Sequence, residues 1–150
     1  MEKHFELTDE TIEVAGNTMH RIRCTRDCKW AKTGDLGGFI EKEDNLSGNA
    51  WLADNAQVYG NARVAGNARL AGKARVAGND DHCGFDVFGS IGRHTHAYRT
   101  SDGGVEITCG CFHGDIEAFE AKERHTHGDS QYAREYLAIA HVIRVKFGLA

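Results

Sequence analysis

The sequence has no apolar run near the ~20 residues that a membrane-spanning helix requires. Its first residues, MEKHFELTDE, are too acidic and polar for a secretory signal peptide. We therefore expect no membrane association and a location in the cytoplasm. A chain of 150 residues is suited to one domain, or to two small units that share a core.

The sequence also lacks a cysteine pattern typical of disulfides, and it has no excess of positive charge. The five cysteines are an odd number without a tight secretory spacing, so reduced thiols are expected rather than disulfides. With 18 Lys and Arg against 22 Asp and Glu, the formal net charge is −4. This balance gives no electrostatic reason to expect direct binding of nucleic acid.

A six-residue repeat fills the middle of the chain. Its six units begin with an aliphatic residue at positions 46, 52, 58, 64, 70 and 76, and read LSGNAW, LADNAQ, VYGNAR, VAGNAR, LAGKAR and VAGNDD. Side chains alternate along a strand, so Ala62 and Val64 are expected to point inward and Arg63 outward. Gly-Asn pairs tolerate left-handed backbone and mark the corners.

One such strand cannot bury its own apolar face, so the units are expected to stack. The pattern resembles the hexapeptide repeat of left-handed parallel β-helices, in which three units form one triangular coil. The handedness comes from that resemblance alone. The resemblance also implies that residues eighteen positions apart lie above one another.

The resulting prediction is an α+β protein built on a short parallel β-helix of two to three coils. Residues 1–45 form an N-terminal β-hairpin cap and a degenerate first coil, 46–81 the hexapeptide-repeat β-helix, and 82–150 a β-hairpin followed by a C-terminal αα-hairpin. In the last part, helices are expected from Gly114 to about His125 and from Ser130 to Lys146, because apolar residues recur at helical intervals.

The hexapeptide resemblance raises the question of acyltransferase activity. Two to three coils make a prism only about 10–15 Å tall at the ~4.8 Å spacing of neighbouring strands. The repeat also contains no histidine before His82. We therefore predict that the protein is not an enzyme and has no catalytic residues.

Arginines on the coils are a candidate ligand-binding set. A phosphate-binding stripe of Arg63, Arg69 and Arg75 is one interpretation, although in a three-sided coil the three residues point from different sides. Ordinary solvated side chains are the alternative, since exposed ion pairs contribute little.

Histidines and cysteines recur after the repeat, in two strands joined at Asp102-Gly103, a favoured two-residue turn. With that turn, His96 pairs with Cys109 and His94 with Cys111, on one face. Two imidazoles and two thiolates are a ligand set that Zn²⁺ accepts, so these four residues could form a structural zinc site. Ordinary core residues or a reactive site are the alternatives. Otherwise no cofactor is expected.

Several segments together resemble small proteins encoded by phages and prophages and described as hexapeptide-repeat or polymer-forming. The segments are KTGDLGGFIEKEDNLSGNAW, the GNARV units, CGCFHG and HGDSQYAREY. That family has no assigned chemistry, so the resemblance transfers no site. It implies a setting in the cytoplasm of a bacterial host.

In that setting we expect a non-enzymatic accessory protein that binds and blocks a host macromolecule, such as a CRISPR-type or other defence nuclease. Acidic clusters, including Glu41, Glu43 and Asp44, could occupy a basic groove of the partner; ordinary solvated charge is the alternative. A host protein partner and homo-oligomers are therefore expected. Sequestration of a nucleotide signal and self-assembly as a structural protein are the alternative functions.

Overall fold

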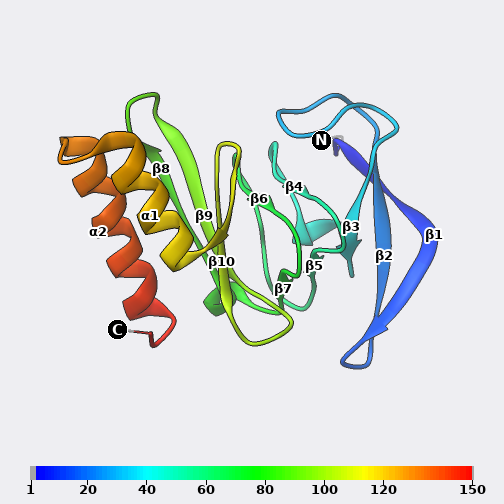
Figure 1. Ribbon diagram of the computed structural model, residues 1–150. Coiled ribbons are helices and arrows are strands. Elements are labelled where there is room, and N and C mark those ends of the chain that lie inside the picture. Colours follow the sequence, from blue (N-terminus) through cyan, green and yellow to red (C-terminus); the bar gives the residue numbers. More distant parts are fainter. Residues whose placement is uncertain (1–2, 150) are drawn as a thin grey trace.

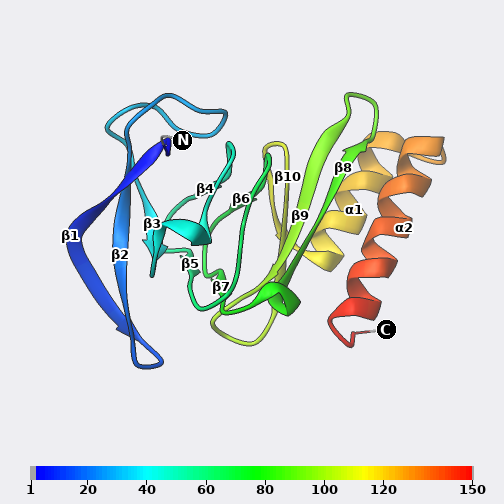
Figure 2. The ribbon, with the colours of Figure 1, turned by 180° about the vertical axis from the view of Figure 1, so that it is seen from behind.

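The computed structural model describes residues 3–149 and places two β-sheet units side by side (Figure 1). The N-terminal hairpin and the repeat form one unit. The C-terminal strands and two helices form the other, with the helices on the side that faces away from the repeat. The reverse view shows the same order of layers (Figure 2).

A five-stranded mixed sheet forms the first unit, in the order β1-β2-β3-β5-β7. The first three strands pair antiparallel and the last three parallel. They are β1 (Phe5–Val14), β2 (Asn17–Cys24), β3 (Leu36–Ile40), β5 (Gln57–Val58) and β7 (Arg75–Val76).

The repeat pairs with itself at a spacing of eighteen residues, as predicted. Trp51 of β4 (Trp51–Leu52) pairs in parallel with Arg69 of β6 (Arg69–Leu70), and Gln57 pairs with Arg75. An isolated parallel bridge joins Leu46 to Val64. The short helix η1 (Glu43–Asn45) lies between β3 and β4 in the chain.

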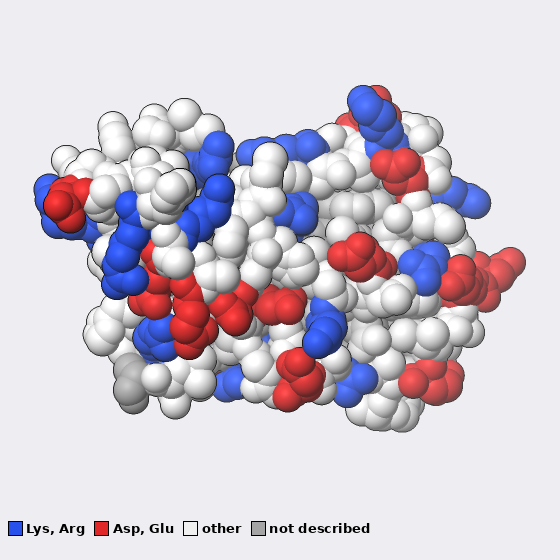
Figure 3. All heavy atoms as spheres, in the orientation of Figure 1, with Lys and Arg blue, Asp and Glu red and all other residues white. Residues whose placement is uncertain are grey.

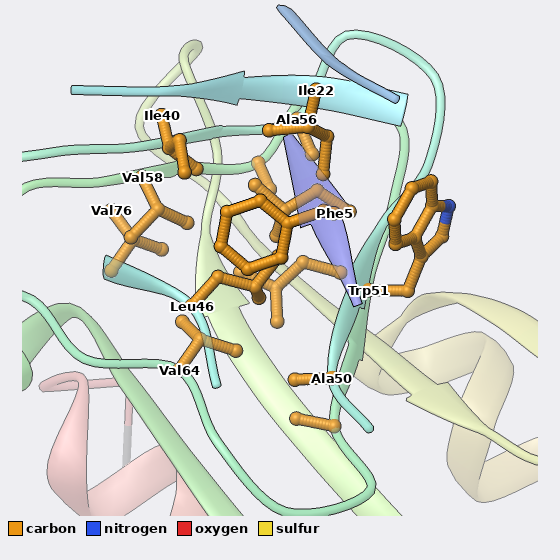
Figure 4. Packing of buried hydrophobic residues seen from close by; sticks show 14 of the residues in the cluster. Phe5, Ile22, Ile40, Leu46, Ala50, Trp51, Ala56, Val58, Val64 and Val76 are labelled. Carbon is orange, nitrogen blue, oxygen red and sulfur yellow. The ribbon is translucent and has the colours of Figure 1, made fainter. Parts of the chain in front are cut away.

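Aliphatic and alanine side chains of the repeat point inward, which confirms their predicted orientation. Ala62 and Val64 are fully buried, and Leu46, Val58 and Val76 lie in the same cluster (Figure 4). Phe5 and Ile22 of the N-terminal hairpin complete this core, so the hairpin and repeat share one apolar interior. A glycine corner permits the close approach of successive turns: a Cβ at Gly48 would lie 2.9 Å from Gly66 N.

The prediction of a parallel β-helix is wrong. Parallel pairing is confined to short strands: β4 and β6 form a small parallel sheet, and the two larger sheets of residues 3–149 are mixed or antiparallel, so the strands do not form a closed parallel β-helix. Two antiparallel contacts explain the difference. The N-terminal hairpin pairs with β3 and extends the sheet sideways, and Ala74 bridges antiparallel to Thr100 at the other end.

Four antiparallel strands form the sheet of the second unit, in the order β11-β10-β9-β8. A short helix, η2 (Asn79–Asp81), leads from the repeat into its edge strand. The strands are β8 (His82–Phe88), β9 (Arg93–Arg99), β10 (Val105–Cys109) and β11 (Phe112–Asp115). One face packs on the helices, and Tyr98 on the other face enters the core of the repeat.

Two C-terminal helices follow, close to their predicted ranges: α1 (Ile116–His127) and α2 (Gln131–Lys146). Each begins at a capping side chain, because Asp115 accepts from Ala118 N and Ser130 from Ala133 N. Gly128 separates them with a positive φ of 57°. Within the described residues, neither helix is long and apolar enough to cross a membrane.

Candidate functional site

The predicted zinc ligands do not come together, because the strand register differs by one residue. Thr108 pairs with His96, and Cys109 pairs with Thr95. A shift of one residue moves side chains to the opposite face of a strand. His94 and His96 therefore lie on the face toward the repeat, whereas Cys109 faces the helices.

The loop between β9 and β10 explains this register. It contains five residues, from Thr100 to Gly104, instead of the predicted two-residue turn. Asp102 Oδ1 accepts hydrogen bonds from the Thr100 hydroxyl and from Gly104 N, and Thr100 Oγ1 accepts a second bond from Gly104 N. Together with Lys73, these donors lower the pKa of Asp102 to about 2.

The two cysteines of the predicted set have ordinary surroundings. Cys109 is buried in the helix-facing core, where its Sγ accepts a hydrogen bond from Thr95 Oγ1 at 3.2 Å. Cys111 is exposed in the turn before β11. Among residues 3–149, no group of three or more His, Cys, Asp or Glu side chains is arranged to hold a metal ion.

A chain of three histidines occupies the place of the predicted site. His96 Nε2 lies 2.8 Å from His82 Nδ1, and His96 Nδ1 lies 2.9 Å from His94 Nε2. The rings stack at centroid distances of 5.1 Å. They lie over Gly84, where a Cβ would meet His96 Nδ1 at 2.7 Å. Spacing along the sequence did not show that His82 belongs to this group, because a strand pairing brings it there.

At each end of this histidine chain, a ring nitrogen lies beside the side-chain oxygen of another residue. Asp86 Oδ1 is bonded to His94 Nδ1. At the other end, Asn79 Oδ1 lies 3.3 Å from His82 Nε2. The same oxygen accepts a hydrogen bond from the backbone N–H of Arg63, which fixes the orientation of the Asn79 amide.

At one end of the histidine chain, the His94 ring lies beside the Asp86 carboxylate. Burial lowers the pKa of His82, and burial followed by the neighbouring histidines lowers the pKa of His96, so these two rings stay neutral. The arrangement can hold and transfer a proton but presents no nucleophile.

The three predicted binding arginines do not form one stripe. Arg69 donates to the backbone oxygens of Gly110 and Phe112 and lies over the ring of Trp30. Arg75 is exposed and donates to Gln57. Arg69 thus joins the repeat to the second sheet, whereas Arg75 only crosses between neighbouring strands.

Arg63 and one predicted acidic residue line the same hollow. It has a volume of about 180 Å³ and includes Lys42, Asp44 and Arg63. Glu43 is exposed in η1, and Glu41 accepts a hydrogen bond from Gly60 N. The predicted acidic set is therefore divided between a structural contact and a mixed-charge hollow.

Acidic side chains gather elsewhere on the surface, over the region where α1 begins and β10 and β11 lie (Figure 3). A hollow of about 340 Å³ there is lined by Asp102, Glu106, Asp115 and Glu117. All four of these carboxylates are engaged: Asp102 with Lys73, Glu106 with His113, Asp115 with the start of α1, and Glu117 with Arg144. These acidic side chains therefore stabilise local structure.

Exposed apolar residues are concentrated in the second unit. Of the eight large hydrophobic residues exposed among residues 3–149, Leu36 alone lies in the first unit. The other seven lie on α2, just after it, or at the β8–β9 turn: Val87, Phe88, Ile91, Tyr132, Val142, Val145 and Leu149. Val87 also has a positive φ of 66°, which is strained for a β-branched residue.

On the outer face of α2, Ala138, Val142 and Val145 follow one another at intervals of four and three residues, which places them along one stripe. Leu149 lies three residues beyond the end of the helix. We call these three helical residues together with Leu149 the outer stripe. Val142, Val145 and Leu149 are 50%, 59% and 49% exposed.

Basic side chains flank the outer stripe. They belong to Arg134 and Lys146, and in the described part of the chain neither of them forms an ion pair with a carboxylate. The adjacent Glu135 is already bonded to Gly89 N and to Gln131. The surface is therefore an apolar stripe with cationic edges.

Comparison with known proteins adds no relative. No family model matches the sequence. A search of the curated proteins finds no significant match.

Proposed function

We propose that the protein is a non-enzymatic accessory protein of a phage or prophage that binds and blocks a host protein through its outer stripe. The observation that supports this proposal is the concentration of exposed apolar residues on α2 and at the β8–β9 turn. Exposed apolar patches of soluble proteins commonly mark interaction surfaces. A component of a host defence nuclease is the class of partner to test first.

Charge complementarity indicates what the partner presents. A second copy of the chain would bring Arg134 and Lys146 against the same residues, and like charges at an interface cost free energy. A host protein with apolar residues flanked by carboxylates would instead pair with both. Such a segment fits the stripe as an amphipathic helix fits an apolar groove.

The test is affinity capture from a lysate of the bacterial host, with the wild-type chain and the double variant V142S/V145S. We expect the wild type to retain one stoichiometric protein and the variant to retain at least tenfold less, because the centre of the apolar contact is lost. Leu36→Ser is the control, since it removes an equally exposed apolar residue from the other unit.

Size-exclusion chromatography of the same proteins separates self-assembly from partner binding. A wild-type elution volume that falls with concentration, and is restored in V142S/V145S, would assign the stripe to a second copy and contradict the proposal. Equal retention of the captured protein by the double variant, or no stoichiometric partner, would contradict it as well.

A further inference from the structure

A second hollow lies between the β8–β9 turn and the two helices, away from the outer stripe. Its volume is about 260 Å³, and its charged and aromatic lining consists of Arg93, Lys122, Glu123, His127 and Tyr136. Ligand sites usually range from roughly 300 to 1,000 Å³. This hollow is therefore large enough for a small ligand or for the phosphate-bearing part of a larger one.

Glu123 is the buried acidic group of the hollow. Its side chain is only 7% exposed. Its Oε2 lies 3.4 Å from His127 Nε2, which is longer than an ordinary hydrogen bond. Burial raises the pKa of Glu123, and the positive charges of His127, Lys122 and Arg93 oppose that rise. A buried carboxyl normally accepts hydrogen bonds, so this group is available to a ligand that carries donors.

Two cations stand at the mouth of the hollow. Arg93 and Lys122 are both exposed, and within the described residues neither forms an ion pair with a carboxylate. The Arg93 side chain lies against Gly110, where a Cβ would come within 3.0 Å of Arg93 Cζ. Glycine at position 110 thus leaves room for the Arg93 side chain in this position. Arg and Lys together are suited to phosphate oxygens.

Aromatic rings provide one wall. The His127 ring stacks on Tyr136 at a centroid distance of 5.9 Å and an interplanar angle of 22°. The Tyr136 hydroxyl donates to Phe88 O at 3.1 Å, which fixes the ring beside the β8–β9 turn. The hollow therefore has cations at its mouth, a carboxyl inside and a fixed aromatic wall.

We propose that this hollow binds a small phosphate monoester that also carries O–H or N–H donors. The phosphate contacts Arg93 and Lys122, and the donors contact the Glu123 carboxyl. A sugar phosphate and a mononucleotide share this chemistry. The site uses none of the outer-stripe residues, so it stands independently of the proposed partner surface.

Isothermal titration calorimetry with ribose 5-phosphate, GMP and inorganic phosphate tests the proposal. We expect at least one ester to bind tenfold or more tightly than inorganic phosphate, because only the esters supply donors to Glu123. Binding of both esters indicates a sugar phosphate, and binding of GMP alone indicates a nucleotide.

Three variants connect binding to the residues. Glu123→Gln and Arg93→Met should each weaken binding of that ester at least tenfold, whereas Glu117→Gln, an exposed change on the same helix, should not. Thermal unfolding of each variant confirms that it is folded. Three results would overturn the proposal. Neither ester binds saturably, the esters bind no more tightly than inorganic phosphate, or the folded Glu123→Gln variant binds the ester with unchanged affinity.

Discussion

Single glycines determine where the side chains of this protein can pack. Gly84 is the clearest case, because the stacked rings of His94 and His96 occupy the space above its Cα. Its backbone is not in the left-handed region, so the requirement for glycine there is steric. The histidine chain therefore depends on a residue that has no polar side chain of its own.

We expect Gly84→Ala to lower the free energy of unfolding by about 1–3 kcal/mol, the usual cost of overpacking. The new methyl group would lie 2.8 Å from His94 Cε1. Urea denaturation provides the measurement. Gly78→Ala is the matched control, since no atom lies within 4 Å of its added Cβ. Equal stability of the two variants would show that the rings move aside without cost.

At the scale of elements, the repeat and the second sheet are joined by side chains from one repeat position. Arg69 and Arg75 occupy equivalent places in successive units. Arg69 reaches the backbone of β11 and the turn before it, and Thr108 of β10 donates back to Arg69 O. The same position thus connects two units in one case and faces solvent in the other.

Arg69→Met should lower the free energy of unfolding by about 2 kcal/mol, because hydrogen bonds to charged groups contribute roughly 1.5–3 kcal/mol. Methionine keeps much of the apolar stem, so the loss measures the bonds to Gly110 and Phe112 together with the contact between the guanidinium and the Trp30 ring. Arg75→Met should change stability by less than about 0.5 kcal/mol. The comparison, made by denaturant unfolding, contradicts the assigned role of Arg69 if both variants unfold alike.

How much the sequence could predict at this scale differs between the units. The repeat has a strong six-residue period. That period correctly predicted that Ala62 and Val64 point inward and that paired residues lie eighteen positions apart. It could not show that the N-terminal hairpin would extend β3 and leave the turns unclosed, because that pairing joins distant segments.

The register between β9 and β10 could not be predicted from the sequence either. Asp102-Gly103 is a good two-residue turn, but the Thr100 side chain closes a longer loop. One residue of difference separated the predicted histidines from the cysteines. The pocket around Glu123 gave no local signal, since its residues come from a turn and two helices.

For the molecule as a whole, the buried histidines connect stability to pH. His82 and His96 have pKa values lowered by burial, so each is neutral when folded and gains a proton more readily when unfolded. Their contribution is present above the unfolded pKa of about 6.5 and is lost as the pH falls toward the lower folded pKa. Acid should therefore destabilise the fold.

We expect the free energy of unfolding to decrease between pH 6.5 and pH 5. His96→Gln should reduce that slope by up to about 1.4 kcal/mol per pH unit, the value for one proton. Denaturant unfolding at several pH values measures both slopes. The exposed His141→Gln is the control, and an unaltered slope in His96→Gln would refute the protonation assignment.

The parallel pairs of the repeat have a consequence for how such chains can vary in length. Each pair is offset by the same eighteen residues, and neighbouring strands are ~4.8 Å apart. Duplication of one eighteen-residue block would insert another layer between unchanged ends. Each added block would then increase, by a fixed step, the distance from the N-terminal hairpin to the outer stripe and to the hollow around Glu123.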